Sequence, residues 1–143
     1  MWSISYLEAS ETFHLKRDKI MINVNVKANK SSAVRLANAP IPRGVITQGK
    51  PTAKAWTSAQ SGDSKVTQGV WECTAGKFNW EYTWDEFVMI LEGEAIVTAA
   101  GGKPVTLKEG DFCYFPAGLK MEWHVPKYVK KTFVIRTQEA MPA

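Results

Sequence analysis

Histidine and cysteine are scarce in this chain. Its 143 residues include only two histidines, His14 and His124, and two cysteines, Cys73 and Cys113. The cysteines form neither a C-x-x-C pair nor a disulfide framework, which favours a reducing compartment, and we expect a cytoplasmic protein. Two histidines so far apart supply few ligands for a metal centre built from several imidazoles. The scarcity argues against a disulfide-stabilised fold and against a tightly bound metal.

Long apolar runs and strong charge are also missing. No run approaches the length needed to cross a bilayer, and the N-terminal residues lack the basic start and apolar core of a signal peptide. The net charge is +4, and the lysines are scattered apart from Lys127, Lys130 and Lys131, which we interpret as a solvated face. We therefore expect neither a nucleic-acid partner nor a membrane partner.

Short apolar segments separated by Gly, Pro, Asp or Lys recur through residues 69–118. These segments are Val70–Cys73, Phe87–Leu91, Ala95–Ala99, Val105–Leu107 and Phe112–Phe115. Short strands at close spacing, without helical periodicity, predict an all-β sandwich or barrel. Gly101-Gly102 predicts a hairpin turn, and Gly93 and Gly110 are expected in turns as well, because glycine tolerates positive φ.

Two spacings in this stretch are more specific. Glu86 is followed by six residues and Gly93, and Gly110 is followed by five residues, Pro116, one residue and Gly118. These resemble the two cupin motifs, E-x6-G and G-x5-P-x-G. The surrounding sequence, GVWECTAGKF, ILEG and GDFCYFPAG, resembles the DUF861 (cupin_3) family of (S)-ureidoglycine aminohydrolase-like and ethanolamine-utilisation-Q-like domains. The resemblance covers about residues 45–136 and implies a single RmlC-like cupin β-barrel, a jelly roll.

The resemblance divides the chain into an N-terminal arm (1–44), the barrel (45–136) and a tail (137–143). Within the arm, Ile20–Val26 alternates apolar and polar residues, which predicts an added strand. Such a strand ahead of a cupin barrel hints at a homodimer, and a plain edge strand is the alternative. After the second motif we expect strands at Lys120–Val125 and Lys131–Ile135, on either side of Pro126.

The histidines of a catalytic cupin are absent at the matching positions. The resemblance implies three histidines and one glutamate as metal ligands, of which only Glu86 is present. The histidine positions hold Trp80 and Tyr82 (or Asn79 and Glu81 with the longer spacing) and Met121. By strand alternation His124 points away from the side of Met121 and Trp123. We predict no resident cofactor or metal, with a divalent ion on Glu86 alone as the weak alternative.

The predicted pocket is aromatic. If Glu86 faces inward and the strand before it stays regular, alternate residues share the face of Glu86, and neighbouring strands add further side chains. The predicted ligand-binding residues are Trp71, Cys73, Trp80, Trp84, Met121 and Trp123. A carboxyl group among indole rings is desolvated, which raises its pKa and lets it donate a hydrogen bond or act as an acid or base.

Three functions remain open on these residues. The preferred one is a small-molecule-binding cupin that holds a carboxylate, an amino or ureido compound, or a sugar around Glu86. The alternative is an enzyme, a hydrolase on ureido or amino compounds or an isomerase, with Glu86 and Tyr82 as catalytic acid and base. The third is a structural dimer module, in which Glu86 caps backbone amides or pairs with Lys120 or Arg136.

Overall fold

A computed structural model of the chain describes residues 25–142. These residues form β-strands and one short 3-10 helix, η1 (Arg43–Val45), so the predicted all-β class is confirmed. Within residues 25–142, no helix is long and apolar enough to cross a membrane. The strands are β1 (Ala37–Asn38), β2 (Ile46–Gly49), β3 (Ala53–Gln60), β4 (Val66–Glu81), β5 (Asp85–Ala99), β6 (Val105–Lys108), β7 (Phe112–Phe115) and β8 (Lys120–Arg136).

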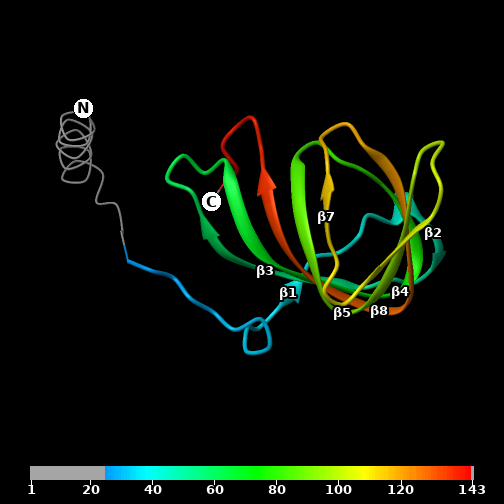
Figure 1. Cartoon of the computed structure of the whole chain (residues 1–143), viewed down its shortest axis with the longest axis horizontal. Helices are drawn as coiled ribbons and strands as arrows, with labels where there is room; N and C mark the ends of the chain where they lie inside the picture. Colours follow the sequence, from blue (N-terminus) through cyan, green and yellow to red (C-terminus); the bar gives the residue numbers. More distant parts are fainter. Residues whose placement is uncertain (1–24, 143) are drawn as a thin grey trace.

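Three long strands form the frame of the barrel. β8 lies between β4 and β5 and pairs antiparallel with both along nearly its whole length. The first half of β4, the second half of β8 and the first half of β5 form one layer with β1, β3 and β7. The other halves form a second layer with β2 and β6. Each long strand therefore contributes to both layers of the jelly roll, whose interior lies between them (Figure 1).

The long strands bend at a common level. The pairing of β4 with β8 shifts between Thr74 and Gly76, and that of β5 with β8 shifts between Gly93 and Ile96. Both shifts lie opposite the part of β8 that contains Pro126. Proline cannot donate to a strand ladder, so its place at an irregularity costs no regular hydrogen bond. The bulges let one strand pass from one layer to the other.

Two predictions about strand ends are wrong for the same reason. Gly93 lies inside β5 and not in a turn, and β8 runs without a break through Pro126. Gly93 has a φ of +72°, and a Cβ at this position would collide with the carbonyl oxygen of Tyr128. A glycine with positive φ or a proline can mark a bulge as well as a turn, and sequence punctuation does not distinguish the two. The turn predictions at Gly101 and Gly110 are confirmed, with φ of +74° and +88°.

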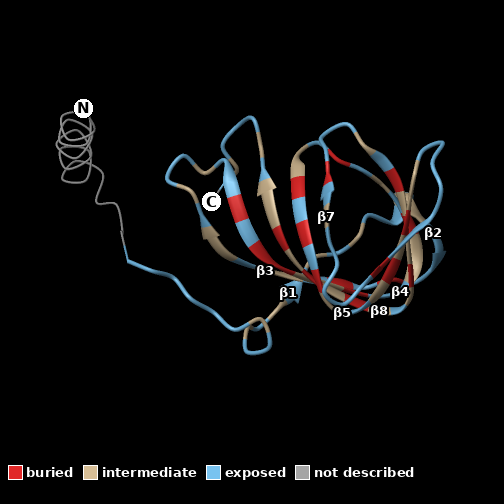
Figure 2. Cartoon of the chain, viewed as in Figure 1, coloured by how far each residue is buried: buried red, intermediate tan, exposed pale blue. Residues whose placement is uncertain are grey.

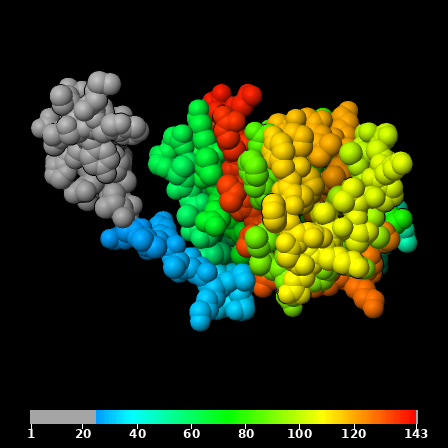
Figure 3. Space-filling view, viewed as in Figure 1, coloured from blue at the N-terminus to red at the C-terminus, as the bar shows by residue number. Residues whose placement is uncertain are grey.

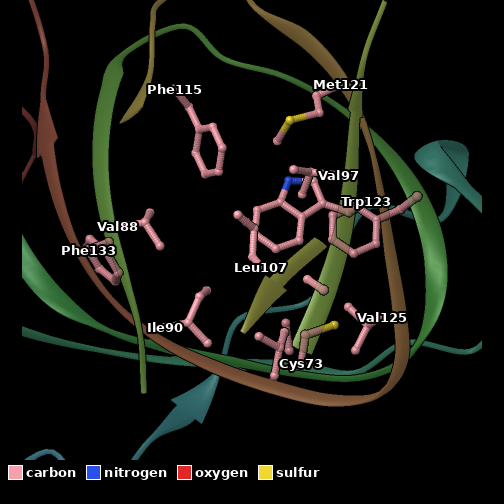
Figure 4. Close-up of a cluster of buried hydrophobic side chains, with 14 of the residues drawn as sticks. Cys73, Val88, Ile90, Val97, Leu107, Phe115, Met121, Trp123, Val125 and Phe133 are labelled. Atoms are coloured by element: carbon pink, nitrogen blue, oxygen red, sulfur yellow. The ribbon is translucent and has the colours of Figure 1, made fainter. Parts of the chain in front are cut away.

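The side chains that alternate inward along the strands fill much of the barrel. Buried residues recur at every second position within each half of β5 and β8, with a break where the strands bend (Figure 2). Figure 4 shows Trp123 within the buried cluster, with Phe115 and Met121 above it in this view and Cys73 and Val125 below. The ring of Trp123 stacks on Phe78 with centroids 6.1 Å apart and an interplanar angle of 4°. This packed cluster borders the site described below.

The arm becomes part of the barrel only near its end. Residues 25–36 run along the outside of the barrel and are mostly exposed (Figures 1 and 3). Lys130 on β8 donates from Nζ to the carbonyl of Ser31 at 2.9 Å, and β1 then pairs with β3. The predicted strand Ile20–Val26 lies almost wholly outside the described residues; only Asn25 and Val26 are described, and neither belongs to a strand.

Candidate functional site

A cavity of about 170 Å³ opens inside the barrel beside the packed cluster. Its walls come from β3, β4, β5, β8, the loop between β4 and β5, and the end of the arm, where Ala39, Pro40 and Ile41 cover one side. The lining is largely aromatic, formed by Trp71, Phe78, Trp80, Tyr82, Trp84, Trp123 and Phe133. Its two charged residues are Glu86 and Lys131.

Glu86 and Lys131 form an ion pair at the wall of this cavity. Lys131 Nζ donates to Glu86 Oε1 at 2.8 Å, and each side chain is 6% exposed. Glu86 enters from the first layer through β5, while Lys131 enters from β8, the neighbouring strand. Removing two charges from water is costly, and the attraction between them offsets that cost only when the geometry is close. A buried ion pair is therefore weak evidence for stability and directs attention to function.

Two indole rings complete the surroundings of the lysine. Nζ of Lys131 lies 4.9 Å from the ring centroid of Trp71 and 5.0 Å from that of Trp123. Trp71 reaches this position because it pairs directly with Lys131 across β4 and β8. The negative faces of indole rings attract an ammonium group, especially where water is excluded. The ammonium group of Lys131 thus has one carboxylate oxygen and two aromatic rings as neighbours.

The interpretation of Lys131 as part of a solvated face is wrong. Lys131 is buried, because it shares the inward face of β8 with Phe133 and Ile135. The signal was available in the sequence: alternation from Phe133 and Ile135 places Lys131, and not Lys130, on the apolar side. The partners considered for Glu86 are also corrected, because Arg136 pairs with Asp85 and Glu86 pairs with Lys131. The expectation of a carboxyl surrounded by indole rings alone did not anticipate this cation.

Tyr82 lies in the cavity wall, but its hydroxyl group forms a hydrogen bond with a residue of the packed cluster. Trp123 Nε1 donates to the Tyr82 hydroxyl oxygen at 3.1 Å, and both residues are almost fully buried. Burial, followed by the charge of Glu86, raises the pKa of Tyr82. The phenolate is therefore disfavoured, which weakens Tyr82 as a base. The backbone of Tyr82 also joins the loop before β5 to the loop between β7 and β8, because it accepts from Gly118 N at 2.7 Å and donates to Leu119 O at 2.9 Å.

Trp80 and Trp84 form one side of the wall, with ring centroids 6.4 Å apart. The strand does not stay regular between them and Glu86, because β4 ends at Glu81 and β5 begins at Asp85. Trp84 Nε1 is the one enclosed side-chain polar atom of residues 25–142 that lacks a hydrogen-bond partner. Because this atom is sealed from solvent, a molecule in the cavity cannot reach it without movement of the ring.

Two of the predicted ligand-binding residues lie outside the cavity lining. Cys73 is completely buried in the packed cluster, and burial raises the pKa of its thiol to about 12. Met121 belongs to the same cluster and borders a separate depression near Gly101. The structure brings together the other predicted residues, Trp71, Trp80, Tyr82, Trp84, Glu86 and Trp123. It adds Lys131, Phe78 and Phe133, together with the arm residues, which the sequence reasoning missed.

The side chains around Glu86 do not match the metal site of a catalytic cupin. Among the described residues, no three or more His, Cys, Asp or Glu side chains lie close enough together to hold an ion. A metal on Glu86 would lie close to the ammonium group of Lys131, which is 2.8 Å from Oε1 of the carboxylate, and like charges repel. His124 is half-buried and does not line the cavity. The donor set therefore does not fit such a metal, and the absence of a resident cofactor stays a prediction.

The jelly-roll barrel with an internal site between its layers defines a cupin. The family model described as "EutQ-like cupin domain" matches residues 60–133, just over half of the chain. The chain belongs to this family. The predicted resemblance to DUF861 and ethanolamine-utilisation-Q-like cupins is thereby confirmed.

Solved structures share this fold at low sequence identity. A DUF861 family protein of unknown function from Pseudomonas syringae pv. tomato superposes with a TM-score of 0.67 and 19% identity, over 72% of this chain and 45% of that one. This chain thus spans less than half the length of the Pseudomonas protein. The EutQ protein of Clostridium difficile gives a TM-score of 0.62 and 18% identity over 77% of this chain and 86% of that one.

A putative ethanolamine utilization protein Q from Salmonella typhimurium gives a TM-score of 0.54 and 20% identity, over 78% of this chain and 98% of that one. At these identities the likeness shows the fold alone. No curated protein matches the chain.

Proposed function

We propose that this cupin domain binds a small molecule in the cavity around Glu86 and Lys131. The observation that carries the proposal is a buried ion pair bordering an open, aromatic cavity. An ion pair needed only for packing could be replaced by apolar side chains at little cost. Apolar concavities that contain a few convergent polar groups are the usual form of a ligand site.

The cavity also limits the size of the ligand. An engineered apolar cavity of about 150 Å³ in another protein accommodates benzene. A cavity of about 170 Å³ therefore suits a molecule of about six to eight non-hydrogen atoms. Among the predicted classes, small carboxylates and amino or ureido compounds fit this limit more easily than sugars.

Binding ranks above catalysis in this proposal. The enzyme alternative assigns acid and base roles to Glu86 and Tyr82. The Glu86 carboxylate is engaged by Lys131, and the Tyr82 hydroxyl accepts from Trp123. The raised pKa of Tyr82 disfavours the phenolate that a base would need, so binding is the better supported role.

The proposal includes a cytoplasmic homodimer. Both cysteines are free thiols, as expected of a protein in a reducing compartment. Four apolar side chains, Phe87, Met89, Phe112 and Tyr114, are 45–81% exposed on the outer face of the paired strands β5 and β7. Exposed apolar groups on neighbouring strands are typical of surfaces that associate.

The test is thermal unfolding of the full chain with small carboxylates, amines, amides and sugars, followed by calorimetric titration of any stabilising compound. The matched variant is Ala55→Phe, because Ala55 lines the cavity beside Trp71, its partner across β3 and β4, and the substitution changes neither Glu86 nor Lys131. We expect saturable stabilisation of the natural chain and none of the variant. Equal stabilisation of both proteins, or no stabilisation by any compound, would contradict the proposal. Nuclear magnetic resonance spectra of the bound compound after incubation would reveal turnover.

A further inference from the structure

The ligand of this cavity can be narrowed by following which polar atoms remain available, an inference that depends on the proposed binding function. Oε1 of Glu86 accepts from Lys131. Oε2 of the same carboxylate accepts no hydrogen bond from any residue in the range 25–142. Trp84 Nε1 is the sole enclosed, unpartnered polar side-chain atom in that range, so Oε2 is not sealed by protein. Because Glu86 lines the cavity, Oε2 is an open acceptor within it.

Lys131, the positively charged partner of Glu86, is less available to a ligand as a hydrogen-bond donor. The ammonium group of Lys131 has three N–H donors. One is directed to Glu86 Oε1, and the faces of Trp71 and Trp123 lie 4.9 and 5.0 Å from Nζ. The ammonium group therefore has three neighbours of negative potential. The cavity presents an unused acceptor, while its cation is already surrounded.

Charge balance further restricts the ligand. Glu86 and Lys131 are the two charged residues of the lining, and they compensate each other at 2.8 Å. An anion has no N–H or O–H group that it could donate to the free oxygen of Glu86. A cation could donate to Oε2, but it would come close to the ammonium group of Lys131, and like charges in a water-poor site repel strongly. An uncharged donor avoids both costs.

The aromatic walls of the cavity indicate that the ligand contains a ring. Seven aromatic side chains line the cavity, and aromatic rings pack favourably against other rings in offset or edge-to-face arrangements. We propose that the site selects an uncharged ring compound of about six to eight non-hydrogen atoms that donates one O–H or N–H hydrogen bond to Glu86 Oε2. Phenol has this chemistry and size and is the probe for the test.

The experiment compares four ring compounds on the full chain by calorimetric titration at neutral pH. Phenol is the uncharged donor, toluene has the same shape without the donor, benzoate is an anion and benzylammonium is a cation. A hydrogen bond to a charged acceptor contributes enough for phenol to bind about tenfold or more tightly than toluene. We also expect phenol to bind more tightly than either ion.

The variant that removes the acceptor is the double substitution Glu86→Met with Lys131→Met, which leaves no unpaired charge in the wall. In this protein we expect the preference for phenol over toluene to fall to less than about threefold. If the double variant does not fold, the four-compound series on the natural chain decides by itself.

The outcomes separate this inference from the proposed function. Toluene, benzoate or benzylammonium binding as tightly as phenol would overturn the donor assignment and leave a binding cavity in place. A preference for phenol that persists in the double variant would overturn the assignment to Glu86. Failure of all four ring compounds to bind would overturn this inference, and the wider set of compounds tested with Ala55→Phe would then decide the proposed function.

Discussion

Two adjacent carboxylates on β5 form ion pairs with β8 in opposite environments. Glu86 points into the barrel and meets Lys131 at 2.8 Å, and both side chains are 6% exposed. Asp85 points outward and meets Arg136 at 3.5 Å, with the arginine side chain 70% exposed. Asp85 also accepts from the Tyr114 hydroxyl at 2.9 Å and from Ala117 N at 3.1 Å.

The comparison shows that the same charge chemistry has different consequences on the two faces of one strand. On the outer face, water screens the charges, and the pair contributes little. On the inner face, both side chains are almost completely buried, so the loss of one charge leaves the other unpaired in the barrel. The two pairs therefore make matched experiments.

The largest expected effect is that of Lys131→Met. This substitution leaves the Glu86 carboxylate inside the barrel without its cation, and we expect a loss of about 3–5 kcal/mol in the free energy of unfolding. The control is Arg136→Met, which breaks the exposed pair and should change stability much less. Urea denaturation of both variants checks the prediction, and equal losses would contradict the contrast between the two faces.

Removal of both inner charges sharpens the same contrast. In the double variant with methionine at positions 86 and 131, no charge remains unpaired, and we expect most of the stability lost in Lys131→Met to be recovered. A double variant no more stable than Lys131→Met would mean that the pair itself stabilises the barrel.

A smaller effect is expected from Tyr82→Phe. Loss of the hydroxyl oxygen leaves the buried Trp123 Nε1 without an acceptor, and we expect a cost of about 1–3 kcal/mol. The control is Tyr114→Phe, which removes a hydroxyl group from the outer face. Tyr114 is 51% exposed there, and water can replace its lost contact with Asp85. Ligand binding should survive in Tyr82→Phe. Loss of turnover or of binding with unchanged stability would instead favour the catalytic role for Tyr82.

The smallest expected effect concerns how the free energy of unfolding falls with pH in acid. The hydrogen bond from Ala117 N, followed by that from Tyr114, lowers the pKa of Asp85 below its ordinary value. Because the pKa is lower in the folded state, this contribution is present above the unfolded pKa and is lost as pH falls through the folded pKa. Asp85→Asn should therefore make the loss of stability between about pH 5 and pH 2 shallower. Unfolding in urea at a series of pH values measures this, and an unchanged slope would count against the assignment.

Much of the fold could be read from local patterns. The short apolar segments, the turn glycines Gly101 and Gly110, and the spacing from Glu86 to Gly118 predict an all-β cupin, as observed. The lengths of the strands could not be read in this way. Gly93 and Pro126 look like the ends of strands, but β5 and β8 continue through them as they bend between layers.

The site was predictable in part. The resemblance to cupins implied that Glu86 lies inside the barrel, and the aromatic residues near the first motif predicted aromatic walls. Lys131 lies 45 positions from Glu86 in the chain, and only the pairing of β5 with β8 brings the two together. The arm residues Ala39–Ile41 were missed because their contact with the cavity depends on how β1 joins β3.

The sequence by itself determined the class of the fold, because alternation, turn residues and the two motif spacings are local properties of the chain. It also determined that an acidic group would lie among tryptophans, since Trp80, Tyr82, Trp84 and Glu86 are close neighbours in sequence. Only the tertiary structure decided what faces that carboxylate. The partner of a buried charge comes from whichever strand the sheet places beside it, and here long-range pairing places Lys131, held by two indole rings, next to Glu86.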